Sequence, residues 1–298
     1  MSLAFFELVV VAVLLCSTGC SCVSRAEASS RRHKNDEART LVAKDRGLTS
    51  NAKRVHAVGE LEVDIDEDGI DDATELSLAK AYFPYYSLNP EDRCSRHGVL
   101  FRLTPHPEDS KKLAIWYVVL FELDCGRRGL GAHVGDDEVF GVLVDPELPA
   151  PAGILAMRGI SHQDAICERV SSCGSLPGCS PCSTAIRGDR PYPVVFSSRN
   201  KHGNYAGEAA CNFWLCDLGS CALNPRPDAP PFVNAGEPWH PLTRNLSSSD
   251  GFITTESGWT EPSLENFDPW GSVKFGKAGD VAADMTDSAF LISPSGCD

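Results

Sequence analysis

The chain has 298 residues, enough for one large domain or one domain with appended segments. Asp and Glu total 41 against 27 Lys and Arg, and the resulting formal net charge of −14 disfavours both nucleic-acid binding and docking on anionic lipid through a basic patch. The 13 cysteines exclude a reducing compartment unless most of them bind metal, and a hydrophobic fraction of 42% excludes a wholly disordered chain.

The N-terminus is predicted to carry an export signal. Residues 8–15 form an uninterrupted apolar run that is too short to span a bilayer, which needs about 20 residues, but fits the core of a secretory signal. The segment Ser17-Thr18-Gly19 before Cys20 resembles a bacterial lipoprotein signal, although no Lys or Arg precedes the run and Ser17 stands where Leu is usual. We therefore expect a signal peptide over residues 1–19 and lipidation of Cys20, with simple cleavage as the alternative. The protein would then be a membrane-anchored lipoprotein of the cell envelope, or extracellular.

The segment that follows is predicted to be a disordered tether. Residues 20–58 are rich in Ser, Arg, Lys, Asp and Glu, and show no apolar periodicity. A segment of this kind cannot bury enough apolar surface to fold. Its basic side chains indicate a solvated stretch rather than a binding patch.

A calcium-binding loop is predicted after the tether. Residues 64–75 read DIDEDGIDDATE and fit the pattern D-x-D-x-D-G-x5-E, in which alternate oxygens surround one hard cation and Gly69 permits a sharp turn. The expected ligands are Asp64, Asp66, Asp68, Ile70 through its carbonyl, Asp72 and Glu75. The loop resembles the single calcium loops of dockerins and thrombospondin type 3 repeats. A charged turn without an ion is the alternative, and a helix from Ala73 to about Tyr82 would complete this unit over residues 59–84.

The body of the chain is predicted to be all-β. Apolar runs rich in Val, Ile and aromatic residues occur between Pro and Gly turns, at residues 99–103, 113–123, 139–144, 154–160 and 194–198. The run at 113–123, LAIWYVVLFEL, is apolar throughout, so we expect a strand buried on both faces. No helix of ordinary length alternates with these strands. We therefore expect an antiparallel, jelly-roll-like β-sandwich over residues 85–223.

Disulfides are expected to stabilise this body. Cys94 and Cys125 form one predicted pair, and four cysteines occur in the predicted loop 164–193, namely Cys167, Cys173, Cys179 and Cys182. A four-thiolate zinc site and a redox-active CxxC at Cys179 and Cys182 are alternatives, but no second close pair and no thioredoxin-like pattern support them. An exported chain favours disulfides.

The Pro-, Gly- and Trp-rich residues 224–298 are predicted to form an extension. It contains Trp239, Trp259 and Trp270. These side chains either pack on the sandwich, which we expect, or form a small aromatic surface.

A second cation site is predicted at one end of the sheet. His133, Asp136 and Glu138 precede an apolar strand, and a hairpin would return them to Asp124. Asp136 and Glu138 share a face of an extended strand, and a turn at Gly135 would bring His133 to the same place. These ligands favour Mg, Ca or Mn, while zinc, an acid–base pair without metal and a solvated hairpin end remain alternatives. His162 and His202 also follow strands and are secondary candidates.

Short motifs resemble two families, over about residues 82–205. The motifs are YFPYY at residues 82–86, WY at 116–117, HVGDDE at 133–138, VF at 195–196 and KHGNY at 201–205. In this order they are similar to the family of vacuolar protein sorting protein 62. The centre also resembles the heptad of the necrosis- and ethylene-inducing-peptide-like cytolysins, whose cation ligands on a β-sandwich would correspond to His133, Asp136, Glu138 and Asp124. Gly135 and Asp137 depart from that heptad and put membrane lysis in doubt.

Three functions follow from these features. The first is a surface-anchored module that binds a polar glycan or lipid head group through its cation. The second is a metal-dependent hydrolase, although no G-x-S-x-G, H-E-x-x-H or P-loop motif indicates an enzyme class. The third is a cytolysin-like membrane-active protein, which a lipid anchor on the producing cell disfavours. The sequence favours the binding module and indicates no nucleic-acid partner.

Overall fold

The computed structural model describes residues 63–126, 128–161, 168–212, 220–225, 230–247, 252–254, 258–277 and 279–297. The described residues all belong to one compact unit. The predicted signal peptide, the lipidation site Cys20 and the tether all lie outside the described residues, as does His162. Within the described ranges, no helix is long and apolar enough to cross a membrane.

The predicted helix is confirmed as α3, Asp72–Tyr82. Its N-cap is Asp71, whose side chain accepts a 2.8 Å hydrogen bond from the Thr74 main-chain N–H and so satisfies one of the free donors of the first turn. Ala79 and Tyr82 bury one face of the helix against the core. This helix directly follows the candidate calcium loop, so the loop is held at the edge of a packed element.

Six strands form the main sheet, in the order β10-β2-β3-β4-β5-β6. Their bounds are β2 His97–His106, β3 Asp109–Asp124, β4 His133–Val144, β5 Ile154–Ser161, β6 Arg169–Gly174 and β10 Phe232–Asn234. Strands β2 to β6 pair antiparallel with their neighbours in chain order, whereas β10 pairs parallel to β2. Four of the five apolar runs predicted as strands are therefore confirmed in this sheet, and the fifth, residues 194–198, largely coincides with strand β8, Arg190–Ser197.

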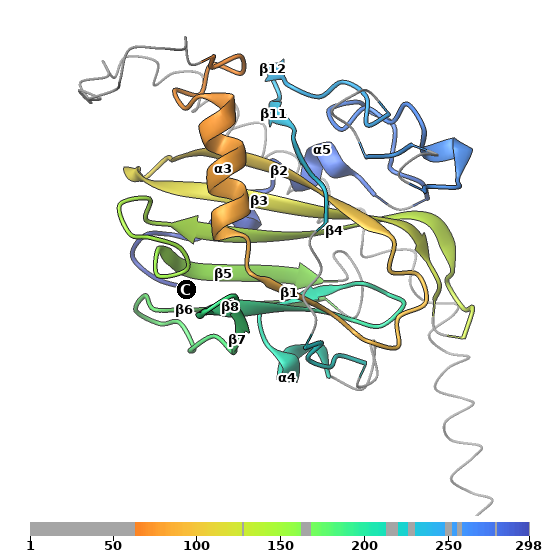
Figure 1. Cartoon of the computed structure of the whole chain (residues 1–298), viewed down its shortest axis with the longest axis horizontal. Coiled ribbons are helices and arrows are strands. Elements are labelled where there is room, and N and C mark those ends of the chain that lie inside the picture. The colour runs from red at the N-terminus through yellow and green to blue at the C-terminus, as the bar shows by residue number, and fades with distance from the viewer. Residues whose placement is uncertain are drawn as a thin grey trace, which may run out of the picture. The chain divides into compact units, whose positions relative to one another are not determined.

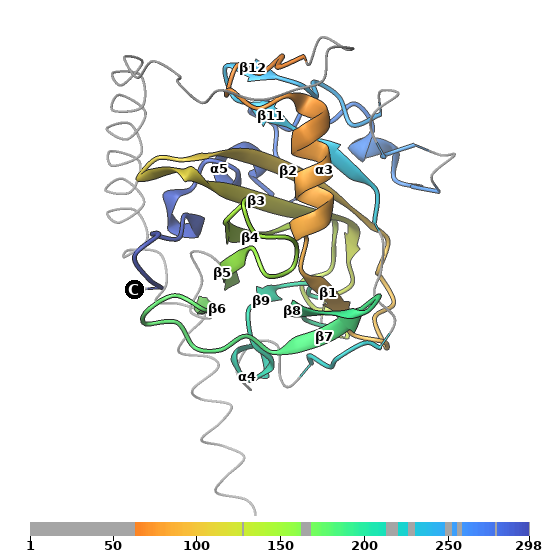
Figure 2. The same ribbon diagram turned by 60° about the vertical axis from the view of Figure 1, so that its left-hand side comes forward.

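Strand β3 is buried on both faces because its two sets of alternating side chains enter two different cores. Odd-numbered residues such as Tyr117 and Phe121 join a core that also includes residues of α3, whereas even-numbered residues such as Trp116 and Leu120 join a core built with the C-terminal extension. Helix α3 runs across the sheet in Figure 1, and Figure 2 shows α5, Val281–Asp284, on the other side of β2 and β3. The main sheet is therefore the middle layer.

A second, four-stranded sheet shares the core on the α3 side. Strands β1, Tyr85–Leu88, and β7, Thr184–Arg187, flank β8, Arg190–Ser197, and the short β9, Asn204–Tyr205, also pairs with β8. The Tyr86 ring lies 6.2 Å from that of Phe140 on β4, which shows the two sheets in contact. The all-β prediction is confirmed. The jelly roll is not, because β2 to β6 form a meander and because β1 pairs parallel to β8.

The C-terminal extension is more than a packed appendage. It contributes β10 to the main sheet, a hairpin of β11, Gly236–Glu237, with β12, His240–Pro241, and the short helices η1, Pro262–Leu264, and η2, Ser288–Phe290. Trp259 is buried in its core and Trp270 packs against that core, whereas Trp239 is 44% exposed. The expected division at residue 224 therefore cuts through one structural unit.

Four disulfides join the described cysteines: Cys94–Cys125, Cys173–Cys182, Cys179–Cys297 and Cys211–Cys221, the last at the end of α4, Glu208–Cys211. The predicted pair Cys94–Cys125 is confirmed. Cys179 and Cys182 bond to different partners, so the described residues contain neither the zinc site nor the redox pair considered for them. The predicted loop 164–193 also differs, since β6 and β7 lie within it; Cys167 lies outside the described residues.

Candidate metal centres

The end of β3 meets the start of β4 at the predicted cation site. Asp124 pairs with His133 in the register of the two strands. Gly135 has φ +69°, which interrupts the alternation that would otherwise send His133 and Asp136 to opposite faces. A Cβ at Gly135 would lie 2.6 Å from Gly276 Cα, so no side chain fits there. As a result, ligand atoms of Asp124, His133 and Asp136 all lie within 4.8 Å of one another.

The hydrogen bonds of His133 orient its ring for ligation. Its Nδ1 donates a 2.9 Å hydrogen bond to the Gly135 carbonyl oxygen, because a carbonyl can only accept. In the neutral imidazole the lone pair is then on Nε2, which lies 3.4 Å from Asp124 Oδ2. A main-chain acceptor on one nitrogen and a free lone pair on the other is the usual arrangement of a metal-binding histidine.

Lys201 and His202 bring positive charge into this site. Lys201 Nζ contacts Asp124 Oδ2, and although burial opposes the charge, this hydrogen bond and the nearby carboxylates raise the pKa of Lys201. His202 Nδ1 lies 3.1 Å from Asp136 Oδ2, and its Nε2 lies 3.5 Å from Asp92 Oδ2. Burial alone would lower the pKa of His202, but the two carboxylates outweigh it and raise the pKa to about 9. The predicted candidate His202 is therefore a cationic neighbour of the site.

Asp92 is a buried anion that sequence reasoning missed. Its Oδ1 accepts a 2.7 Å hydrogen bond from the Cys94 main-chain N–H, and its Oδ2 accepts one of 2.6 Å from Asn200. Burial would raise its pKa, but these bonds and His202 lower it. A signal existed, because the predicted disulfide Cys94–Cys125 places the segment of Asp92 beside that of Asp124. Nothing comparable marked Lys201 beyond its position before His202.

Glu138 is not brought into the cluster. The group of converging ligand atoms found among the described residues contains Asp124, His133 and Asp136 without Glu138. Glu138 still acts on the site through its field, which raises the pKa of Lys201, and its main-chain oxygen accepts a 3.1 Å hydrogen bond from Asn204 Nδ2.

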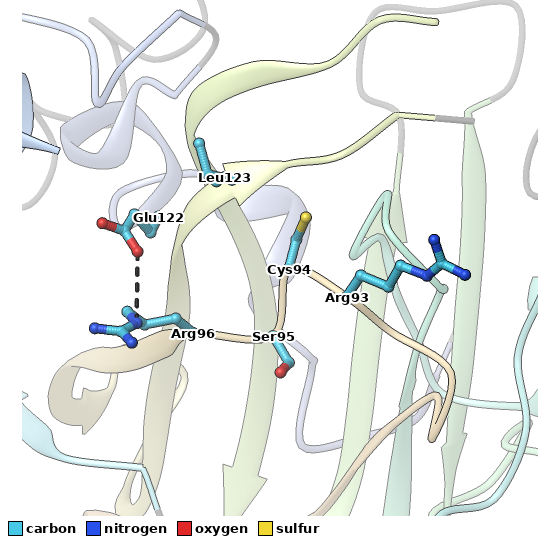
Figure 3. A pocket seen from close by; sticks show the side chains of 6 residues that line it. All are labelled: Arg93, Cys94, Ser95, Arg96, Glu122 and Leu123. Atoms are coloured by element: carbon cyan, nitrogen blue, oxygen red, sulfur yellow. Dashed lines mark ion pairs between the residues drawn. The ribbon is translucent and has the colours of Figure 1, made fainter. Parts of the chain in front are cut away.

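Two adjoining hollows flank the cluster. One of about 320 Å³ has Asp124 and His133 in its wall; its lining is Leu123, Asp124, Cys125, Ala132, His133 and Val134. The other, of about 240 Å³, is lined by Arg93, Cys94, Ser95, Arg96, Glu122 and Leu123. Figure 3 shows the second hollow, where Arg96 pairs with Glu122 at 3.5 Å and Arg93 extends away from both. Leu123 lines both hollows, so a ligand at the cluster would have open space on one side.

The candidate calcium loop has the local geometry of a cation cradle. Ligand atoms of Asp64, Asp66 and Asp72 lie within 4.8 Å of one another. The turn is formed by Gly69, which has φ +97° and whose N–H donates a 3.0 Å hydrogen bond to Asp64 Oδ2. Ile70 anchors the loop, because its side chain lies in the core and its N–H donates a 2.8 Å hydrogen bond to Asp68 Oδ1.

Several carboxylate oxygens of this loop are buried without a hydrogen-bond partner. They are Asp64 Oδ1, both oxygens of Asp66, Asp68 Oδ2 and Glu75 Oε1, and the side chains of Asp66 and Glu75 belong to residues with no exposed surface. Burial, followed by the neighbouring carboxylates, raises the pKa of Asp66 to about 8 and that of Glu75 to about 10. Burying unpaired anions is costly, so the donor set fits a hard divalent cation.

Residues of the C-terminal extension surround this loop, which the sequence did not indicate. Asn234 Nδ2 donates a 2.9 Å hydrogen bond to Glu75 Oε2. The buried Glu237 raises the pKa of Asp66 and of Asp68 through its charge, after the larger effect of burial. Glu237 is itself held by Arg102 through hydrogen bonds of 2.9 and 2.8 Å. The loop therefore contacts the first part of the C-terminal extension.

Comparisons with known proteins add little. No family model and no curated protein matches the chain. A solved structure described as "Toxin fold for microbial attack and plant defense" is similar over 55% of this chain and 74% of its own, with 15% identity and a TM-score of 0.30. A likeness of this size establishes neither a shared fold nor a shared activity. The resemblances to the two families therefore stay hypotheses.

Proposed function

We propose that this chain is an exported, lipid-anchored surface protein that binds a polar glycan or lipid head group through a divalent cation. The cation is Mg, Ca or Mn, held by Asp124, His133 and Asp136. The observation that supports this most is the convergence of these ligand atoms within 4.8 Å beside an open hollow. Two carboxylates and one imidazole are ligands that such cations accept.

The charges around the site favour a divalent ion. Four carboxylates, Asp92, Asp124, Asp136 and Glu138, act within one network, against the two cations Lys201 and His202. Two negative charges are therefore left over in a poorly solvated region, and one divalent cation neutralises them. The ion would also carry open coordination positions on the side of the hollow.

Recognition would combine this cation with the lining of the hollow. Hard cations accept neutral oxygen ligands, so a pair of sugar or glycerol hydroxyls can complete the coordination. The side chains of Leu123, Ala132 and Val134 line the same hollow and offer apolar contact to the flat face of a sugar or to a lipid neck. This pattern, a few polar groups within a partly apolar wall, is typical of ligand sites.

The calcium loop has a structural role in this proposal. Calcium would fill the cradle of Asp64, Asp66, Asp68, Asp72 and Glu75, with the carbonyl of Ile70, and hold the loop on the body. Extracellular calcium is abundant, which matches the export signal and the four disulfides. Cys20 would fix the protein to the membrane through its lipid.

The test compares the native chain with Asp136→Asn and with Asp145→Asn. Asp145 pairs with Lys112 at 2.6 Å, away from the cluster, so its variant is a matched control. We expect purified native protein to carry a bound cation at this cluster in addition to the calcium of the loop. It should bind members of a glycan panel or lipid vesicles only when that cation is present. EDTA and Asp136→Asn should each abolish this binding, while Asp145→Asn should retain it.

The same assay separates the other candidate functions. Cation-dependent cleavage of an ester or glycoside panel would make the protein a metal-dependent hydrolase that activates water at the site. Release of dye from vesicles would make it a cytolysin-like protein. Binding that persists in both EDTA and Asp136→Asn would contradict the cation-dependent site.

A further inference from the structure

We infer that Lys201 competes with the divalent cation for Asp124, because its ammonium contacts the carboxylate oxygen that the metal would bind. The inference rests on the proposed metal site and adds to it the residue that sets the affinity of that site. Lys201 holds Asp124 when the metal is absent and leaves it when the metal binds. The native chain therefore binds its cation more weakly than the three ligands alone would.

Both oxygens of Asp124 already have a hydrogen-bond partner. Its side chain is 2% exposed, and its Oδ1 accepts the hydrogen bond of the Gly126 main-chain N–H. The remaining oxygen, Oδ2, is the atom that Lys201 Nζ contacts, and it lies 3.4 Å from His133 Nε2. Lys201 Nζ and His133 Nε2 thus both approach the same oxygen, which is the atom that a metal shared by Asp124 and His133 would bind.

An ammonium and a metal cannot both use this oxygen without strong repulsion. A divalent ion binds carboxylate oxygen at roughly 2.0–2.6 Å, and a charged N–H donor requires about 2.7–2.9 Å. Two cations at these distances from one buried atom would lie only a few ångströms apart in a region of low dielectric constant. Metal binding therefore requires the ammonium to leave.

The surroundings of Lys201 allow that movement. Its side chain is 26% exposed, and its ammonium is carried on a flexible four-carbon stem. A Cβ added to Gly131 would lie 3.7 Å from Nζ, which is an ordinary contact distance. The main chain stays fixed, because Ser198 N–H donates to the Gly203 oxygen at 3.1 Å and His202 N–H donates to the Ser198 oxygen at 2.8 Å. The ammonium can therefore turn to solvent without unfolding the loop.

The neighbouring cation, His202, cannot move in this way. It has no exposed surface, its ring stacks on Phe121 at 3.7 Å and 4°, and its two nitrogens face Asp136 and Asp92. It stays as a permanent counter-ion, so the competition is specific to Lys201.

The experiment is a titration of the full-length native protein, Lys201→Met and Lys112→Met with Mn²⁺, followed by electron paramagnetic resonance of the free ion. Lys112 is the matched control, because it makes a comparable ion pair with Asp145. We expect Lys201→Met to bind Mn²⁺ at least tenfold more tightly than the native chain, and Lys112→Met to equal the native chain. Lys201→Met combined with Asp136→Asn should lose the tighter binding, which assigns it to this site and not to the calcium loop.

A second measurement does not depend on native metal binding. In EDTA, Lys201→Met should lower the melting temperature because Asp124 loses its counter-ion, and Mn²⁺ should restore it. Lys201→Gln serves in the same two measurements if the methionine variant does not fold. Equal or weaker Mn²⁺ affinity in the variant overturns the inference and leaves the metal site standing. If only the variant binds Mn²⁺ at this site, the inference is supported and the native protein holds no metal there. If neither protein binds Mn²⁺ at this site, both the inference and the proposed metal site are overturned.

Discussion

The indole N–H of Trp239 donates a 3.1 Å hydrogen bond to the main-chain oxygen of Asp66. Trp239 belongs to the C-terminal extension and Asp66 to the candidate calcium loop, which are separated by most of the described chain. Since Asn234 also bonds to Glu75 of the loop, the extension contacts the loop at two of its predicted ligand residues. A spectroscopic signal from the extension should therefore report whether the loop holds an ion.

Terbium should report this contact. Tb³⁺ has oxygen preferences like those of calcium, and its luminescence is excited by energy transfer from a nearby indole. We expect ultraviolet excitation of the chain with Tb³⁺ to give strong emission that excess calcium abolishes. Trp239→Phe should remove most of that emission.

Trp270→Phe is the matched control for this experiment. Trp270 lies in the same extension, but its indole N–H bonds to the Ala235 oxygen and not to the loop. This variant should keep most of the emission. Equal losses in both variants would contradict the placement of the ion beside Trp239.

Asp66→Asn tests the calcium loop through stability. Both carboxylate oxygens of Asp66 are buried without a hydrogen-bond partner. The charge of Asp66 therefore destabilises the fold when calcium is absent, and the same oxygens coordinate the ion when calcium is present. We expect calcium at a hundredfold excess over its dissociation constant to stabilise the native chain by about 2.7 kcal/mol. The variant should lose most of this gain, yet equal or exceed native stability in EDTA.

Denaturant unfolding with calcium and with EDTA checks this prediction. Asp189→Asn is the control, because the Asp189 side chain is 94% exposed and far from any predicted ligand in the sequence. It should respond to calcium as the native chain does. A native protein whose stability is the same in calcium and EDTA would rule out a structural ion in the loop.

Local patterns explain why much of the fold could be predicted. Strand β3 is recognisable because a strand between two cores has no polar face, and α3 because its apolar spacing marks the buried face. The meeting of His133 with Asp136 was predictable from Gly135, the one residue type that adopts the required backbone turn freely. These features depend on residues close together in the chain.

The missed features depend on contacts between distant segments. The parallel pairings of β1 with β8 and of β10 with β2 join segments whose register is set by tertiary packing, which local propensity does not encode. Lys201 and Asp92 reach the candidate metal site for the same reason, each from a loop far from β4 in sequence. The sequence therefore indicated three side chains that converge, Asp124, His133 and Asp136, and missed the charged groups around them.

His106 should make stability depend on pH. Its Nε2 donates to the Ile292 oxygen at 3.0 Å and its Nδ1 accepts from the Glu108 N–H at 3.1 Å, so the folded protein requires the neutral ring. Burial lowers the pKa of His106 below its usual value, more than the nearby Glu108 raises it. The unfolded chain then binds more protons below about pH 6.5, so this contribution is present above that pH and is lost as the pH falls.

Urea unfolding of the native chain and of His106→Asn between pH 5 and 8 measures this effect. The carboxylates titrate alike in both proteins, so they cancel in the difference. The stability advantage of the native chain should shrink as the pH falls from 7.5 to 5.5, by about 1.4 kcal/mol for each unit by which the folded pKa is lowered. A difference that is constant over this range would contradict a neutral, buried His106.

The disulfide Cys94–Cys125 should affect the proposed metal site as well as stability. It closes a loop of 31 residues, and replacing both cysteines with Ser should cost about 3–4 kcal/mol by loop-closure entropy.

The Cys94–Cys125 disulfide also joins the segment of Asp92 to that of Asp124. Its loss should separate Asp92, which faces His202, from the proposed metal ligands and weaken Mn²⁺ binding. The pair Cys173–Cys182 closes a loop of 9 residues and is the matched control, because Cys173 pairs with Met157, which pairs with Val142 in the half of β4 that is remote from His133 and Asp136. Its double Ser variant should lose somewhat less stability and keep the native Mn²⁺ affinity, because only the first disulfide connects two sides of the charge network. Equal Mn²⁺ affinities in both variants would show that packing alone holds Asp92 against His202.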